Sequence, residues 1–371
     1  LTALNHQEPD QVPIDLGATE NSTITRIAYQ NLRDHLGMAP DPDPFIINRQ
    51  MDAVYPQEDL LERYQVDFRP VRPSPTWTAQ TREMPDDSFY DELGIRWRKA
   101  GYYYDMVEHP MRGFTLPEIL ETRWPDAHQA GRMAGIRAGA ENLYRDTDKA
   151  LVVGHIIWGP FELGCALRGY DQFLMDFYED EALAEKLLDK NLELALNFWD
   201  AYLGEVGDLV QVAAQGDDLG MQTGPIISPK MYRRFIKPRH KQLFDFIRSK
   251  TNAKIYLHSC GSVFDLIPNF IEAGVEILNP VQMTAAKMDL VNLKKTFGKD
   301  LTFWGGGVDT QQTLPHGTLD EIKDQVSRIF DIMAPGGGFV FVPVHNIQAN
   351  IAPERIHAVY QTALQKRAYQ P

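Results

Sequence analysis

The chain is poor in cysteine, which limits the class of protein that it can be. Cys165 and Cys260 are the only cysteines among 371 residues. Two thiols cannot form the disulfide framework of a small secreted protein, and free thiols suit a reducing compartment. Residues 1–6 also lack the basic and apolar regions of a secretory signal peptide. We therefore expect a cytoplasmic protein.

Long apolar runs and an excess of positive charge are also missing. No apolar run is long enough to cross a membrane as a helix, so we expect no membrane partner. The formal net charge is −14, because 51 Asp and Glu residues outnumber 37 Lys and Arg residues. This negative charge disfavours contact with phosphate backbones, and we expect no nucleic acid partner.

What the chain does contain is a regular alternation of strand and helix patterns. Apolar runs predict six strands after residue 150, at about 151–158, 209–213, 254–258, 277–278, 301–304 and 339–342. Helical spacing of apolar residues follows them, at about 181–202, 229–249, 263–272, 290–297, 319–333 and 353–365. Such alternation is typical of a parallel sheet covered by helices.

Two earlier strands, at 12–16 and 66–69, bring the predicted number to eight, which favours an α/β fold of the (β/α)8 TIM barrel type. An open doubly wound sheet is disfavoured because no glycine-rich loop follows the first strand. We expect one domain over residues 1–371, with an N-terminal helical extension and an insertion at about 73–125. Within the insertion, residues 95–98 and 102–104 predict a β-hairpin.

The end of the predicted strand 254–258 carries the most informative motif, His258-Ser-Cys260. Side chains at i and i+2 of a strand point the same way, so an imidazole nitrogen and a thiolate could bind one metal ion. The alternative is a small buried thiol beside a histidine that bonds a backbone carbonyl. The local pattern leaves both interpretations open.

Other strand ends carry polar side chains, and barrel enzymes place their chemistry at the carboxyl ends of strands. Three carboxylates are candidates for proton transfer, although carboxylates at loop starts are also ordinary helix caps: Glu162, Asp217 and Asp218. Five further residues are candidates for substrate binding: Gln222, Asn279, Gln282, Trp304 and Asp309.

His345 follows the last predicted strand and is a candidate third metal ligand. In a barrel, the ends of the fifth and eighth strands face each other across the mouth. His258, Cys260 and His345 would then supply three donors and leave one open position, as catalytic zinc sites require. The alternative is a histidine that hydrogen-bonds the substrate. His155 lies inside a predicted strand, and we interpret it as a core histidine.

An ordered series of segments resembles the uroporphyrinogen decarboxylase superfamily, whose other large branch contains cobamide-dependent methyltransferases. The segments are ALNHQEPDQVP at 3–13, HSCGS at 258–262, GVEILNPVQ at 274–282, FWGGGVD at 303–309, HNI at 345–347 and APE at 352–354. The resemblance covers nearly the whole chain outside the insertion. It implies a (β/α)8 barrel, in agreement with the strand count.

The branch decides the chemistry that the resemblance implies. True decarboxylases carry an arginine-rich segment near the start that binds the carboxylates of the substrate, whereas this chain has no arginine before Arg26. A porphyrinogen with eight carboxylates needs cationic partners, so the segment disfavours porphyrin decarboxylation. Thiol methyltransferases of the other branch carry His-X-Cys and a downstream cysteine. This chain has His345 at that place, and the decarboxylases also have a histidine there.

The resemblance to the methyltransferase branch implies a zinc-dependent enzyme. The enzyme would move a methyl group between a corrinoid and a small methylated substrate, such as a methyl ether or amine, or a thiol. The chain has no Asp-X-His-X-X-Gly cobamide signature, so the corrinoid cofactor would come from a separate corrinoid protein. Family members are often homodimers.

Two other functions remain open at this point. The first is a metal-free decarboxylase or lyase for a smaller acid, with Asp217 or Asp218 as proton donor. The second is a non-enzymatic module that binds a corrinoid or another tetrapyrrole.

Overall fold

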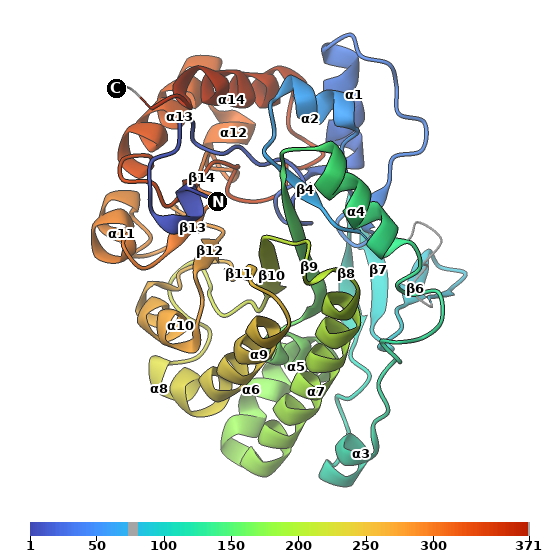
Figure 1. Cartoon of the computed structure of the whole chain (residues 1–371). Coiled ribbons are helices and arrows are strands. Elements are labelled where there is room, and N and C mark those ends of the chain that lie inside the picture. The colour runs from blue at the N-terminus through green and yellow to red at the C-terminus, as the bar shows by residue number, and fades with distance from the viewer. Residues whose placement is uncertain (73–80, 370–371) are drawn as a thin grey trace.

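A curled parallel sheet of seven strands forms the centre of the computed structural model, which describes residues 1–72 and 81–369 (Figure 1). The strand order is β14-β13-β12-β11-β10-β9-β4, and every neighbouring pair is parallel. The strands are β4 (Phe68–Pro70), β9 (Ala150–Trp158), β10 (Val212–Gly216), β11 (Lys254–His258), β12 (Ile277–Asn279), β13 (Thr302–Trp304) and β14 (Phe339–Val340). The predicted parallel sheet is confirmed for these seven strands.

The eighth position is filled by a segment that bonds to both edges of the sheet. The Asp67 amide donates to the Ile14 carbonyl at 2.9 Å beside β4, and the Phe341 amide donates to the Pro13 carbonyl at 2.9 Å beside β14. The predicted strand at 12–16 is therefore present only as an isolated bridge. Pro13 has no amide hydrogen, so a continuous ladder cannot form there. The result is a barrel-like α/β fold.

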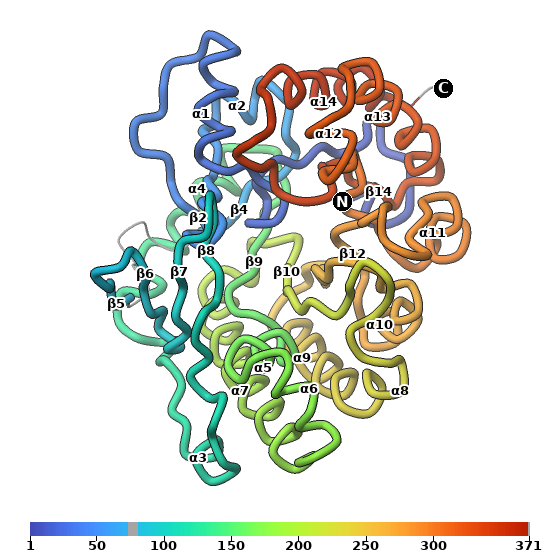
Figure 2. Tube along the Cα trace, turned by 180° about the vertical axis from the view of Figure 1, so that it is seen from behind, coloured from blue at the N-terminus to red at the C-terminus, as the bar shows by residue number. Residues whose placement is uncertain are grey.

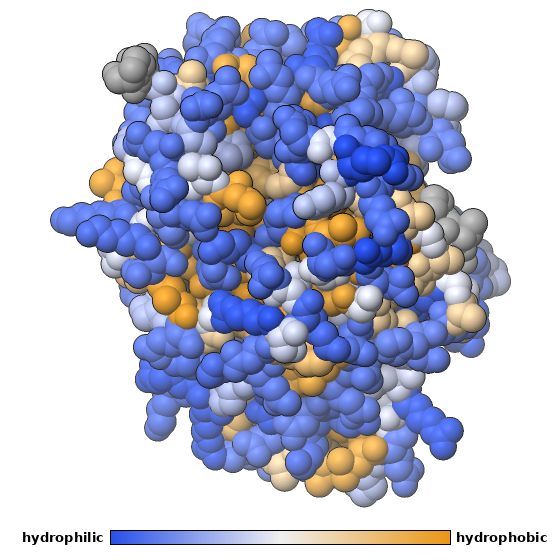
Figure 3. All heavy atoms as spheres, viewed as in Figure 1, coloured by the Kyte–Doolittle hydropathy of each residue, from blue (hydrophilic) through white to orange (hydrophobic). Residues whose placement is uncertain are grey.

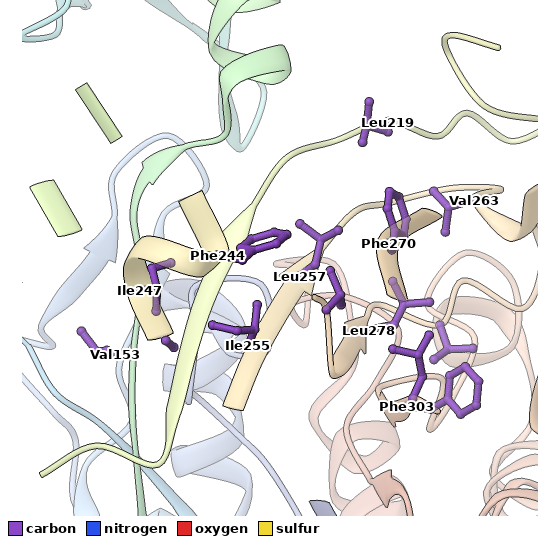
Figure 4. Close-up of a cluster of buried hydrophobic side chains, with 14 of the residues drawn as sticks. Val153, Leu219, Phe244, Ile247, Ile255, Leu257, Val263, Phe270, Leu278 and Phe303 are labelled. Carbon is purple, nitrogen blue, oxygen red and sulfur yellow. The ribbon is translucent and has the colours of Figure 1, made fainter. Parts of the chain in front are cut away.

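Helices cover the outside of the sheet (Figures 1 and 2). They are α5 (Pro160–Arg168), α6 (Tyr170–Glu179), α7 (Glu181–Val206), α9 (Lys237–Lys250), α10 (Ile267–Ala273), α11 (Leu290–Phe297), α13 (Leu319–Met333) and α14 (Pro353–Lys366). Figure 4 shows Phe244 and Ile247 of α9 beside the side chains of Ile255 and Leu257 on β11. This apolar layer joins the helices to the sheet.

Two predicted elements differ from the structure for a clear physical reason. The predicted helix at 229–249 is divided into α8 (Pro229–Met231), a π-helical turn (Tyr232–Ile236) and α9, because Pro238 in the first turn of α9 lacks an amide donor. The predicted strand at 209–213 is displaced to β10. Leu209 and Val210 are buried in the loop before it, so their apolar character reflects burial and not strand structure.

The insertion is larger than a hairpin. It forms an antiparallel sheet of β5 (Arg82–Glu83), β6 (Ser88–Tyr90), β7 (Arg96–Ala100) and β8 (Tyr103–Glu108). The predicted hairpin is confirmed as β7 and β8. Helices α3 (Leu116–Glu121) and α4 (Ile136–Asp146) then lead to β9.

The N-terminal part holds little helix before the barrel. Instead of the predicted helical extension, one 3-10 turn (Ala3–Asn5) precedes the first barrel segment. Helices α1 (Arg26–His35) and α2 (Glu58–Arg63) follow that segment and flank a small sheet of β1 (Ile24–Thr25), β2 (Ile46–Asn48) and β3 (Ala53–Val54). The one further α-helix of the described residues is α12 (Thr313–His316), and a 3-10 turn (Phe264–Leu266) precedes α10. No helix in residues 1–72 and 81–369 is long and apolar enough to cross a membrane.

The inside of the barrel is filled by side chains from alternate strand positions. Phe68, Tyr256 and Trp304 form its aromatic part, and the Phe68 and Trp304 ring centroids lie 4.2 Å apart. Gly154 permits this packing, because a Cβ there would lie 2.5 Å from the Ala214 side chain. Hydrophilic residues cover most of the outer face seen in Figure 3.

The buried Asp15 gives the barrel core a predicted pH dependence. Asp15 accepts a hydrogen bond from Trp304 Nε1 at 2.8 Å, and burial raises the pKa of Asp15 from 3.8 to about 6. The folded state therefore binds this proton more tightly than the unfolded state does. The resulting stabilisation is complete below pH 3.8 and is lost as the pH rises through about 6.

We expect the free energy of unfolding of the wild type, minus that of Asp15→Asn, to fall by roughly 2 kcal/mol between about pH 4 and pH 7. Urea unfolding at the two pH values measures this difference, and the subtraction removes the contributions of other carboxylates. A difference that is independent of pH would contradict the raised pKa of Asp15.

Candidate metal centre and active site

Three predicted metal ligands come together at the carboxyl ends of the barrel strands. His258 is the last residue of β11, Cys260 follows it, and His345 lies in the loop after β14. One potential ligand atom of each residue lies within 4.8 Å of the others. Cys260 Sγ is 3.3 Å from His258 Nε2, and the two histidine ring centroids are 5.8 Å apart. The expected juxtaposition across the barrel mouth is confirmed, and the identity of the bound ion stays a prediction.

Amide side chains orient both histidines in the same way. Nδ1 of His258 donates to Oδ1 of Asn279 at 2.5 Å, and Nδ1 of His345 donates to Oδ1 of Asn346 at 2.8 Å. The orientation of Asn279 is determined by its Nδ2, which donates to the Trp304 carbonyl at 2.7 Å. Each Nε2 therefore carries a lone pair, which is the form of histidine that binds metals.

Burial controls the protonation of the three ligands. Burial lowers the pKa of His258 well below its usual value, and the neighbouring histidines lower it further; burial also lowers the pKa of His345. Both histidines are therefore neutral at pH 7. Burial and the carboxylates of Asp218 and Glu162 raise the pKa of the Cys260 thiol well above its usual value. A cation placed among these groups would stabilise the thiolate.

The donor set fits zinc. Two neutral imidazoles and one thiol are nitrogen and sulfur donors, which zinc prefers, whereas magnesium and calcium prefer oxygen. Three protein donors leave one coordination position for a substrate, as in catalytic zinc sites. The amide partners of the two histidines supply the outer contacts that such sites usually have.

Two of the three predicted proton-transfer carboxylates lie beside this cluster. Oδ1 of Asp218 accepts the Cys260 amide at 2.8 Å and lies 3.7 Å from His258 Nε2. The Asp218 amide donates to Oε2 of Glu162 at 3.2 Å. Burial and the charge of Asp217 raise the pKa of Asp218 to about 6. Burial and the other two carboxylates raise the pKa of Glu162 well above its usual value, so this group can hold a proton at neutral pH.

The third carboxylate, Asp217, has a different set of contacts. Its side chain is fully buried, and its oxygens accept the amides of Phe161 at 3.3 Å and Glu162 at 2.6 Å in the first turn of α5. His240 Nε2 lies 2.7 Å from Asp217 Oδ2, and Tyr232 lies 3.0 Å from the other ring nitrogen of His240. These contacts tie α5 to β10 and so hold Glu162 in place.

The predicted substrate-binding residues are distributed over three locations. Asn279 and Trp304 lie beneath the metal cluster. Gln222 and Gln282 lie together at the rim, where Gln282 Nε2 donates to Gln222 Oε1 at 3.0 Å and the Gly261 amide donates to Gln282 at 2.8 Å. Asp309 is buried, and its carboxylate accepts three amides at the start of α12, as a helix cap does.

The sequence interpretation missed His155. Its ring centroid lies 5.5 Å from that of His258, its Nδ1 lies 3.1 Å from Asn21 Nδ2 and 3.6 Å from Glu20 Oε1, and its buried Nε2 has no partner in the described residues. The register of β9 against β10 shifts here, and the φ angle of His155 is +52°. This bulge redirects a side chain that strict alternation assigns elsewhere. The apolar run around His155 contains no signal of the bulge.

His155 also lines a cavity of about 810 Å³ between β9, the N-terminal segment and the insertion sheet. The volume lies within the usual range for small-molecule sites. Glu20 lines the same cavity. Because the His155 ring contacts His258, this cavity adjoins the metal cluster.

Comparison with known proteins identifies the family. The family described as "Uroporphyrinogen decarboxylase (URO-D)" matches residues 106–365, and the chain belongs to this family. No curated protein matches the chain.

Among solved structures, a methyltransferase from Methanosarcina mazei superposes with a TM-score of 0.65 and 20% identity, over 98% of this chain and 97% of that chain. This likeness shows a common fold. A member of the enolase superfamily from Salmonella Typhimurium matches 65% of this chain and 56% of that chain at 11% identity, with a TM-score of only 0.27. The family match supports an enzymatic role.

The donor geometry predicts about one zinc ion per chain. We expect His258→Ala, Cys260→Ser and His345→Ala to lose it, and His345→Cys to keep it, because thiolate and imidazole are both good zinc donors. Elemental analysis of each variant measures occupancy, and far-UV circular dichroism should remain unchanged because the ligands lie at strand ends and not in the core.

The single variants test separate parts of this assignment. Full zinc occupancy in His345→Ala would exclude His345 as a ligand and move it to the substrate pocket. A wild-type protein that contains no zinc after purification without chelators would exclude the metal site as a whole.

The Asn279 contact predicts a distinct effect on metal affinity. Asn279→Ala should weaken zinc binding by about 10- to 100-fold, because His258 loses the acceptor that holds its ring and tautomer. Competition with a chromophoric chelator measures this affinity. Gln222→Ala is the matched control, since Gln222 is an amide of the same mouth that bonds no ligand histidine. Equal losses in both variants would contradict the role of Asn279.

Proposed function

We propose that the protein is a zinc-dependent methyltransferase that moves a methyl group between a corrinoid on a partner protein and a small substrate. The substrate is a methylated compound, such as a methyl ether or amine, or a thiol. The observation that carries this proposal is the convergence of His258, Cys260 and His345 on one point at the barrel mouth. The methyltransferase with the same fold supports it.

Zinc bound there would supply Lewis-acid chemistry, which stabilises the heteroatom that loses or accepts the methyl group. The chain's own residues prepare the site for that role. His258 and His345 present Nε2 lone pairs because Asn279 and Asn346 hold their Nδ1 protons. The neutral imidazoles and the buried thiol leave the cluster without positive charge of its own.

Glu162 and Asp218 are the proposed proton-transfer groups. Both have raised pKa values, and the Cys260 amide binds Asp218 directly. A proton held on Glu162 can pass to the heteroatom that the methyl group leaves, or can be taken from a substrate thiol. Asp217 has its oxygens engaged by α5 and His240, so we assign it to the positioning of Glu162.

Of the remaining predicted residues, two are placed to contact a substrate and three have structural roles. Gln222 and Gln282 lie at the rim, where their amides can bond a substrate or a docked partner. Asn279 supports His258, Trp304 lies in the barrel core, and Asp309 caps α12. The sequence printed here has no cobamide-binding signature, and the proposal therefore takes the corrinoid from a separate protein.

A second candidate function is a metal-free decarboxylase or lyase for a smaller acid. It is favoured by the description of the matching family and by Asp218, whose pKa of about 6 suits a proton donor near neutral pH. The two functions differ in their need for zinc. Decarboxylation without metal would release carbon dioxide in the presence of chelators, whereas methyl transfer would cease.

The methyltransferase proposal predicts that turnover needs zinc and an added corrinoid. With reduced free cobamide, methyl ethers or amines should convert the cobalt absorption spectrum to that of the methylated form. Cys260→Ser should slow this reaction by about 100-fold or more, because the metal-dependent stabilisation amounts to several kcal/mol.

Cys165→Ala is the matched control, since Cys165 is the other cysteine and lies buried in α5 outside the metal cluster. Its activity should equal that of the wild type. Turnover of a porphyrinogen or a smaller acid without corrinoid, at the same rate in Cys260→Ser, would contradict the proposal.

A further inference from the structure

Arg72 occupies an unusual position in the cavity that adjoins the metal cluster. It follows β4, at the same end of the barrel as the other strand-end residues, and lines the cavity together with His155. Its guanidinium carbon lies 4.2 Å from the ring centroid of Tyr55 and 4.6 Å from that of Phe45. Two aromatic rings therefore hold the cation in place.

The other arginines of the cavity are already paired with carboxylates. Arg26 lies 3.0 Å from Asp52, Arg49 lies 2.6 Å from Glu83, and Arg132 lies 2.8 Å from Glu92. These pairs neutralise three of the positive charges that line the cavity. Lys99 also lines it but is exposed to solvent.

Arg72 differs from these residues because no described carboxylate pairs with it. Within residues 1–72 and 81–369, the ionisable neighbour of Arg72 is Tyr55. Burial lowers the pKa of Arg72, yet an arginine stays charged at neutral pH. A largely desolvated cation without an anion is costly, so the site favours a negatively charged ligand.

We propose that Arg72 binds the carboxylate of the substrate, and that the substrate is a planar, methylated monocarboxylic acid. One guanidinium matches one carboxylate through two parallel hydrogen bonds, whereas a porphyrinogen would need several cations. Tyr102 and Tyr104 also line the cavity with solvent-accessible rings, which favour an aromatic ring in the substrate. The methylated end would point toward His155 and the metal cluster. This inference rests on the proposed function, from which it takes the methyl group.

Calorimetric titration with 4-methoxybenzoate and its neutral isostere 4-methoxybenzamide tests the inference. The acid should bind the wild type, and the amide should bind roughly 10- to 100-fold more weakly, because charge-assisted hydrogen bonds are lost. Arg72→Gln should weaken binding of the acid by a similar factor and leave binding of the amide unchanged. Arg49→Gln is the matched control, since Arg49 also lies over an aromatic ring of this cavity but is paired with Glu83.

Several outcomes would overturn the inference: no binding of the acid, equal binding of acid and amide, or equal losses in the Arg72 and Arg49 variants. If Arg72→Gln does not fold, the inference is tested by comparing the affinities of the acid and the amide for the wild type and for Arg72→Lys. Arg72→Lys keeps the charge without the planar fork and should bind the acid with intermediate affinity.

This binding assay needs neither zinc nor corrinoid, and Cys260→Ser should keep most of the affinity for the acid. Arg72-dependent binding without methyl transfer would therefore refute the proposed function alone. Methyl transfer from neutral ethers without any preference for acids would refute the role of Arg72 alone.

Discussion

The hydrogen bond between Asn279 and His258 is the contact on which the candidate site depends. Asn279 ends β12 and His258 ends β11, so the bond joins adjacent strands through their side chains. The other end of Asn279 donates to the Trp304 carbonyl on β13, and the Trp304 indole donates to Asp15. A continuous chain of hydrogen bonds thus connects the barrel interior with the ligand atom at its mouth. The ring of His258 is positioned by the core and not by the metal.

The acidic groups around Cys260 determine the electrostatic potential at the candidate metal site. Glu162, Asp217 and Asp218 are carboxylates drawn together by the ends of β9 and β10, and mutual repulsion and burial disfavour full ionisation. Asp217 relieves part of this cost through helix amides and His240. The remaining negative potential lies beside the Cys260 thiol, and it would stabilise a divalent cation bound there.

The strand-end residues were predictable because a parallel sheet brings the carboxyl ends of its strands to one edge. His258 and Cys260 share a local motif, and the strand count alone predicted that His345 lies near them. The first barrel strand was not predictable in the same way, because Pro13 interrupts its ladder while its neighbours keep an apolar pattern. The place of His155 beside the metal cluster was not predictable, for a related reason. A bulge changes the direction of one side chain without changing the apolar run around it.

Arg72 and Asp309 illustrate how partners, and not residue types, decide function. Both are charged residues that follow a barrel strand, which is where barrel enzymes place their active-site residues. The carboxylate of Asp309 is bonded to three backbone amides, which leaves it little capacity for a substrate. Arg72 is held between two rings, and its charge has no counterpart in the described residues. No sequence pattern distinguishes a charged side chain that has partners from one that lacks them, because the partners come from distant segments. Arg72, which has no carboxylate partner among the described residues, would bind the charged end of an anionic substrate, and the carboxylates beside Cys260 would repel that end. The neutral end of the substrate would then lie toward the metal site.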